Sequence, residues 1–205
     1  MSNGVLLLID VQRDFLPGGA LGVPGGDEIV PLINQSAPRY AFVLATRDFH
    51  PADHCSFATN HAGRKPGDVV EVNGIDQVLW PPHCVQGTAG AEFAPGMDAG
   101  LITKTFLKGI DPGLDSYSAF FDNARKRSTG LAEYLDAQGC DRLDLCGLAT
   151  DYCVLWSVLD ARSLGIGVTV LADACRGIDL KPGDTERAFA RMQKAGATLA
   201  RFVKG

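Results

Sequence analysis

Short, almost continuous apolar runs recur along the chain, and they limit the folds that it can adopt. Six such runs, the last of them weaker, span residues 4–9, 40–46, 100–106, 142–149, 167–172 and 197–203. A strand with one solvated face alternates apolar and polar residues, whereas a strand that is apolar throughout is covered on both faces. The runs therefore predict parallel strands that lie between layers of helices.

Patterns typical of amphipathic helices separate several of these runs. The last three patterns end at a glycine, which commonly terminates helices; the four span residues 26–37, 128–139, 151–165 and 183–196. Asp27 and Asp151 are the expected N-caps of the first and third helices. Strands that alternate with helices of this length form βαβ units. We therefore predict an α/β fold in three α/β/α layers, with a central, mostly parallel six-stranded sheet and helices on both faces.

One long segment interrupts this alternation. Residues 47–100 are rich in proline, glycine and histidine, and their hydrophobic periodicity is weak. A long irregular stretch inside a compact domain is usually functional or disordered, and here the short segment DVVEVNG and the repeated prolines favour an ordered insertion. The chain contains no internal repeat, low-complexity tract or linker. Residues 1–205 are therefore predicted to form a single domain that carries this insertion.

Charge and composition narrow the classes of partner and location. The net charge of −5 offers no basic surface to nucleic acid or to an anionic membrane, and no apolar run reaches the roughly 18 residues of a membrane span. The N-terminal apolar run lacks a basic region before it, so we interpret it as a strand rather than a signal peptide. The expected location is the cytoplasm, where thiols stay reduced. The sequence leaves the formation of a homo-oligomer open.

Side chains that can do chemistry follow four of the predicted strands. They are Asp10 after the first strand, Asp48 and His50 after the second, Lys104 and Lys108 at the third, and Cys153 after the fourth. In open parallel sheets, functional residues gather at the carboxyl ends of the strands. We therefore expect these groups to converge at one edge of the sheet.

Cys153 falls in the first turn of the helix expected to begin at Asp151. The unpaired N–H groups and the helix dipole at that position would favour the thiolate and could hold an oxyanion. Asp10 could act as a general base if burial shifts its pKa, and a lysine facing it would keep it ionised. The alternatives remain a packed structural cysteine and an aspartate that caps a turn.

The four histidines all lie in the insertion and suggest a metal site. Asp48 and His50 are two apart in an extended segment and so point to the same side, and His83 could complete the set. One carboxylate and two or three imidazoles suit zinc, iron or manganese, with coordination positions left for water. Polar loop histidines are the alternative interpretation. Six cysteines without a CxxC pair disfavour both a cysteine-rich zinc site and a disulfide framework.

Six motifs in order resemble the nicotinamidases (pyrazinamidases) of the isochorismatase-like cysteine hydrolase superfamily over nearly the full length. They are LLLIDVQRDF, TRDFHPADHCSF, WPPHCVQGTAGAEF, KGIDPGLDSYSAFFDN, GLATDYCV and LADACRG. The resemblance implies hydrolysis of nicotinamide to nicotinate and ammonia through a cysteine thioester, in NAD salvage. It implies pyrazinamide as a second substrate.

The resemblance also implies a role for each catalytic residue. Asp10 would be the base, Cys153 the nucleophile and Lys108 the cation between them, with Lys108 preferred to Lys104 because its spacing to Tyr117 fits the family. Ala149 and Cys153 would supply the N–H groups of the oxyanion hole. The peptide bond that enters Ala149 would be cis.

Substrate and metal ligands follow from the same resemblance. Phe15, Trp80 and Tyr117 would stack around the pyridine ring. Asp48, His50 and His83 would hold a divalent metal that anchors the ring nitrogen, with His54 as a further candidate ligand. Zinc is the expected ion, and iron and manganese are the alternatives.

The presence of both the cysteine and the Asp-x-His set argues against other isochorismatase-type hydrolases. A metallohydrolase, in which a metal-bound water attacks, and a metal-binding module without activity remain as alternatives.

Replacement of the cysteine distinguishes the thiol mechanism from the metal-water mechanism. Cys153→Ala removes the nucleophile, so ammonia release from nicotinamide should fall almost to zero. A metal-water enzyme would retain substantial rate in the same assay, and that result would contradict the thiol mechanism.

Overall fold

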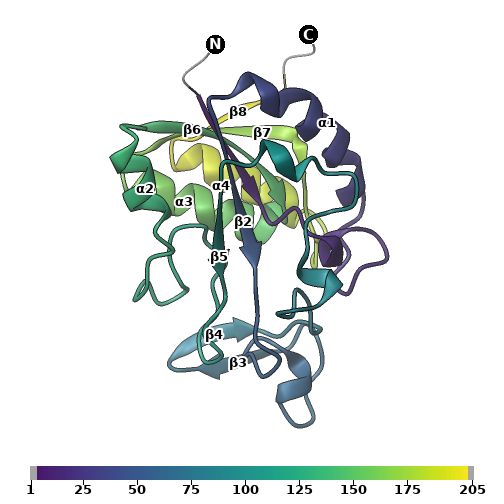
Figure 1. The fold of residues 1–205 in the computed structure, drawn as a ribbon. Coiled ribbons are helices and arrows are strands. Elements are labelled where there is room, and N and C mark those ends of the chain that lie inside the picture. Colours follow the sequence, from purple (N-terminus) through teal and green to yellow (C-terminus); the bar gives the residue numbers. More distant parts are fainter. Residues whose placement is uncertain (1–3, 203–205) are drawn as a thin grey trace.

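The computed structural model describes residues 4–202, and a six-stranded sheet runs through its centre (Figure 1). Every neighbouring pair of its strands is parallel, in the order β5-β2-β1-β6-β7-β8. The strands are β1 (Val5–Ile9), β2 (Phe42–Asp48), β5 (Lys104–Lys108), β6 (Arg142–Leu148), β7 (Gly167–Arg176) and β8 (Thr198–Ala200). The predicted α/β class and six-stranded parallel sheet are therefore confirmed.

Several strand predictions differ from the structure at their ends. The second predicted strand is shifted by two residues, to Phe42–Asp48, and the fifth extends four residues further, to Arg176. The third strand begins at Lys104, because Ala99–Leu101 form a 3-10 turn and Thr103 then joins the chain to β2. The last strand ends at Ala200, and Val203 of its predicted range lies outside the described residues. Residues 1–3 and 203–205 of the predicted single domain lie outside them as well, and the one-domain organisation stays a prediction.

Helices cover both faces of the sheet. The helices are α1 (Ile29–Ser36), α2 (Leu131–Ala137), α3 (Leu155–Ser163) and α4 (Asp184–Lys194). Helix α1 lies on one face of the sheet, and α2, α3 and α4 lie together on the other (Figure 1). None of the described helices is both long and apolar enough to cross a bilayer.

Both predicted N-caps are wrong. Glu28 precedes α1 without a side-chain cap, because Gly26–Glu28 first form a 3-10 turn that includes Asp27. The third predicted helix begins as a π-helical turn, Thr150–Val154, before α3. Asp151 caps neither element, since its carboxylate accepts hydrogen bonds from the loop after β7 instead.

Part of the insertion forms a second, smaller sheet. Strands β3 (Val69–Val72) and β4 (Ile75–Val78) pair as an antiparallel hairpin beyond the C-terminal end of β2 (Figure 1). Asn73 and Gly74 at its tip both have positive φ, as the common two-residue hairpin turn requires. The segments on either side of the hairpin carry the predicted metal ligands.

The centre of the sheet is packed closely enough to require a glycine. All five residues of β1 are at most 2% exposed. Gly147 of β6 has φ +132, and a Cβ there would lie 2.1 Å from the carbonyl oxygen of Ile9. This close approach brings the ends of β1 and β6 together at the point where the strand order reverses, which is where open α/β sheets form their binding crevice.

Candidate functional site

Four strand ends bring their polar side chains together at this crevice. Asp10 directly follows β1, Asp48 ends β2, Lys108 ends β5, and Cys153 lies in the turn after β6. All four are at most 6% exposed. The structure therefore confirms that these side chains converge at one edge of the sheet, and it shows that they are buried there.

The Lys108 ammonium is the centre of the group. Its Nζ lies 2.8 Å from Asp10 Oδ2 and 3.4 Å from Cys153 Sγ, donates to the Ser116 carbonyl at 3.0 Å, and also pairs with Asp48. These partners raise the pKa of Lys108 well above its usual value against the effect of burial, so the ammonium stays charged.

Lys104 does not take part in this group. It is exposed, and its Nζ lies 4.4 Å from the centre of the Tyr134 ring, on the outer part of the edge strand β5. Of the two lysines proposed from the sequence, only Lys108 reaches Asp10.

Asp10 is a carboxylate whose environment suits a general base. Burial raises its pKa to about 6, although Lys108 and a hydrogen bond from Thr46 Oγ1 at 2.7 Å act in the opposite direction. Near neutral pH the group is therefore ionised and still basic enough to accept a proton.

Cys153 differs from the expectation of a stabilised thiolate. Burial raises the pKa of its thiol well above the usual value; Lys108 acts in the opposite direction, and the Asp10 and Asp48 carboxylates act in the same direction as burial. The sulfur lies within 4.8 Å of carboxylate oxygens of both aspartates. The resting group is therefore a thiol that lies beside a carboxylate, because burial in the crevice affects the pKa of Cys153 more than its position at a helix start does.

The turn before Cys153 has the backbone that the resemblance implied. The Leu148–Ala149 peptide bond is cis. The Ala149 carbonyl accepts hydrogen bonds from the N–H groups of Tyr152 and Val154, both at 3.1 Å, which fixes the π-helical turn. Ala149 and Cys153 both line the cavity above the sheet.

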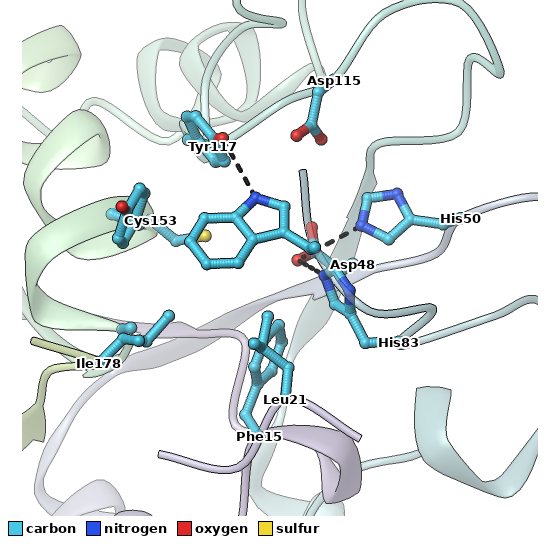
Figure 2. Close-up of a pocket in the computed structure, with 12 residues that line it drawn as sticks. Phe15, Leu21, Asp48, His50, His83, Asp115, Tyr117, Cys153 and Ile178 are labelled. Carbon is cyan, nitrogen blue, oxygen red and sulfur yellow. Dashed lines mark hydrogen bonds and ion pairs between the residues drawn. The ribbon is translucent and has the colours of Figure 1, made fainter. Parts of the chain in front are cut away.

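A second set of groups adjoins the first through Asp48. Asp48, His50 and His83 each present a ligand atom, and these atoms lie within 4.8 Å of one another. His50 Nδ1 donates to the Gly109 carbonyl and His83 Nδ1 to the Pro81 carbonyl, both at 2.8 Å. Each ring therefore turns Nε2 toward Asp48 Oδ2, at 3.7 and 4.0 Å (Figure 2).

This arrangement fits a divalent metal. Imidazoles that bind metals usually donate their other N–H to a carbonyl or carboxylate, as both rings do here. Burial lowers the pKa of His83 to about 4, so its Nε2 carries a lone pair at neutral pH. Three such donors leave coordination positions for water or substrate.

His54 lies beside this set with an unused nitrogen. The residue is fully buried, its Nδ1 contacts Ser56 Oγ at 2.7 Å, and its ring centre is 4.2 Å from that of His50. Its Nε2 has no hydrogen-bond partner. It therefore remains a candidate ligand, and together with His50 and Asp115 it forms a second cluster of possible donors.

The cavity between these two sets has aromatic walls. As the side chains stand, its free volume is about 20 Å³, roughly the space that one water molecule needs. The three residues proposed to hold a ring, Phe15, Trp80 and Tyr117, all line it. Figure 2 shows Phe15 and Tyr117 there. Trp80 Nε1 donates to the Tyr117 hydroxyl at 3.2 Å, which fixes the two rings relative to each other.

The sequence did not identify all the residues of the site. Leu21, Asp115, Tyr152 and Ile178 also line the cavity. Tyr152 packs edge-on against Trp80 at 4.8 Å and adjoins Cys153 in the chain, which is a signal that could have indicated it. Ile178 follows the end of β7, so the strand-end argument could have been extended to it.

Gln12 is a further residue whose role the sequence did not reveal. Its side-chain amide accepts from the Asp48 N–H and donates to the Asp48 carbonyl, both at 2.8 Å, and also donates to the Ala91 carbonyl at 2.9 Å. The buried amide thus fixes the backbone of Asp48, whose carboxylate belongs to both sets of groups.

Comparison with known proteins gives consistent relatives. The profile of the family described as "Isochorismatase domain" matches residues 4–202. The nicotinamidase of Escherichia coli (strain K12) is 46% identical over 203 residues, which are 97% of this chain and 95% of that protein.

Solved structures extend the similarity to the fold. The nicotinamidase/pyrazinamidase of Acinetobacter baumanii has a TM-score of 0.94 at 43% identity and covers 98% of this chain and 97% of its own. The pyrazinamidase of Pyrococcus horikoshii, solved in complex with zinc, has a TM-score of 0.80 at 36% identity and covers 98% and 100%.

Removal of the central ammonium should destabilise the protein. Lys108→Met leaves Asp10 and Asp48 buried without their cation, which should cost roughly 3–5 kcal/mol in the free energy of unfolding at pH 7. The loss should shrink as the pH falls, because protonated carboxyls tolerate burial. Lys104→Met on the same strand is the control and should cost no more than about 1 kcal/mol. Equal losses in urea unfolding would show that the ammonium does not compensate the carboxylates.

Proposed function

The chain belongs to the isochorismatase family, and we propose that within it the protein is a nicotinamidase, which hydrolyses nicotinamide to nicotinate and ammonia. The observation that carries the proposal is the contact of one buried ammonium, Lys108, with both Asp10 and Cys153 beside an aromatic cavity. Near full-length similarity to the E. coli nicotinamidase supports it. Pyrazinamide, a similar flat amide, is the second proposed substrate.

The proposed reaction begins with the thiol. Asp10 takes the proton of Cys153, and the resulting thiolate attacks the carboxamide carbon while the Lys108 ammonium offsets its charge. The tetrahedral oxyanion accepts hydrogen bonds from the backbone N–H groups of Ala149 and Cys153. Protonated Asp10 returns its proton to the leaving nitrogen, so ammonia departs and a thioester remains on Cys153.

The second half of the reaction regenerates the thiol. Asp10 removes a proton from water, and the hydroxide attacks the thioester carbonyl at the same oxyanion hole. The C–S bond breaks, the proton on Asp10 returns to the sulfur, and nicotinic acid leaves and loses its remaining proton to solvent as nicotinate. One base of pKa about 6 can serve both halves, because it must alternately accept and donate near neutral pH.

The cavity walls would orient the substrate. Phe15, Trp80 and Tyr117 offer flat apolar surfaces for the ring, and stacked or edge-on ring pairs contribute about 0.5–1.5 kcal/mol each beyond burial. The fixed ring would point its carboxamide at Cys153, and such positioning can lower a barrier by several kcal/mol.

We propose that Asp48, His50 and His83 hold a divalent metal, with His54 as a further ligand. Zinc is the proposed ion, supported by the zinc complex of the Pyrococcus horikoshii pyrazinamidase, and iron and manganese are the alternatives. When bound, the ion supplies a Lewis-acid site for the ring nitrogen of the substrate.

The proposed setting is NAD salvage in the cytoplasm. The proposed reaction converts a pyridine carboxamide into a pyridine carboxylate, and this chemistry supports a role in NAD salvage. The mechanism requires Cys153 to remain a reduced thiol, which a reducing compartment provides.

The acid limb of the pH profile tests the role of Asp10. Ammonia release from nicotinamide should show a kcat/KM that falls as the pH drops below about 6, because the protonated carboxyl cannot act as a base. Thr46→Val removes a hydrogen bond to the ionised form, so the limb should move to higher pH. Thr198→Val on the exposed edge of β8 should leave the limb in place. No ammonia release would contradict the function, and an unmoved limb in Thr46→Val would contradict the assignment of the base.

Metal content tests the second set of groups. The protein should bind about one equivalent of zinc per chain, and His83→Ala should weaken that binding at least about 100-fold in a chelator competition. His61→Ala is the matched control, because His61 is partly buried and lies outside the donor clusters of the described residues. Equal zinc affinity in the two variants would contradict the proposed ligand set.

A further inference from the structure

The loop that follows β7 contributes one wall of the cavity. β7 ends at Arg176, and residues 177–179, which belong to no helix or strand, lead from it toward α4. Ile178 of this loop lines the same cavity as Cys153 (Figure 2). The position of this side chain therefore depends on whatever holds the loop.

Asp151 holds the inner side of the loop. Its Oδ1 accepts from the N–H of Ile178 at 2.9 Å, and its Oδ2 accepts from the N–H of Asp179 at 2.8 Å. Two charge-assisted hydrogen bonds from one carboxylate to consecutive amides fix both the position and the direction of a backbone segment. The aspartate is 9% exposed, so water competes little for these bonds.

A second contact holds the outer side of the loop. Asp179 accepts from the N–H and the hydroxyl of Thr185, in the first turn of α4, at 2.8 and 2.9 Å. Gly177 fits between the two anchors, since a Cβ there would lie 1.9 Å from Thr185 Oγ1 and 3.3 Å from Asp151 Oδ1. The loop is thus fixed on both sides, with Ile178 between the anchors.

We propose that Asp151 is a positioning residue that sets substrate affinity by holding Ile178 against the bound ring. Asp151 and Cys153 are two residues apart in the same π-helical turn. This turn therefore positions the proposed nucleophile directly and, through the loop, the Ile178 side chain that lines the cavity. The carboxylate itself does not line the cavity. This inference rests on the proposed nicotinamidase function and adds a determinant of its affinity.

A double-mutant cycle on the KM for nicotinamide tests the proposal. Asp151→Asn replaces one acceptor oxygen by an NH2 group that faces a backbone N–H, and Ile178→Ala removes the wall directly. Each should raise KM about 10-fold with a smaller change in kcat. Because both act on the same wall, the double variant should be no worse than the more affected single variant.

Several results would overturn the proposal. Multiplication of the two effects to about 100-fold, a fall in kcat with KM unchanged in Asp151→Asn, or no change at all would each do so. Asp144→Asn is the control for the loss of a partly buried carboxylate. Asp144 lies on β6, away from the loop, and accepts a hydrogen bond from the Tyr40 hydroxyl, so the KM of this variant should not change.

Two further measurements keep the outcome decisive. If Asp151→Asn does not fold, Thr185→Val loosens the outer anchor and should give the same rise in KM and the same non-additivity with Ile178→Ala. Wild-type protein that releases no ammonia from nicotinamide would refute the proposed function. Active wild-type protein with an unchanged KM in the anchor variants would refute only the positioning role.

Discussion

A buried ammonium between two buried carboxylates is the interaction on which the rest of the site depends. Lys108 is 2% exposed and contacts Asp10, Asp48 and Cys153 at once. A buried ion destabilises the folded state unless it is paired, so the charged groups at these strand ends depend on one another for their burial. The same ammonium therefore joins the thiol and its base to the groups proposed to hold a metal.

The surroundings of the two carboxylates give them different properties. Burial outweighs the other effects on Asp10 and raises its pKa to about 6, whereas Lys108 and His50 outweigh burial on Asp48 and lower its pKa. One carboxylate is thus suited to exchange protons near neutral pH, and the other to remain an anionic ligand. Two chemically identical groups a few ångströms apart can take separate roles in this way.

Much of this arrangement was predictable from local sequence, and the failures share a cause. Apolar runs identify parallel strands because a strand that is buried on both faces consists almost entirely of apolar residues. Functional residues gather at the carboxyl ends of such strands, which predicts that Asp10, Asp48 and Cys153 lie together. The cap expected at Asp151 and the expected thiolate were wrong, because contacts from distant segments and burial decide both. Gln12 acts through the backbone of Asp48, a contact between distant segments that no local pattern records.

The partition of an acyl-enzyme between water and hydroxylamine tests covalent catalysis most directly. If nicotinamide and methyl nicotinate both acylate Cys153, the common thioester must give the same ratio of nicotinohydroxamate to nicotinate from either substrate at a fixed hydroxylamine concentration. We predict equal ratios, and neither product above background in Cys153→Ala. Ratios that depend on the leaving group would contradict a common acyl-enzyme, because the two substrates would then be attacked directly.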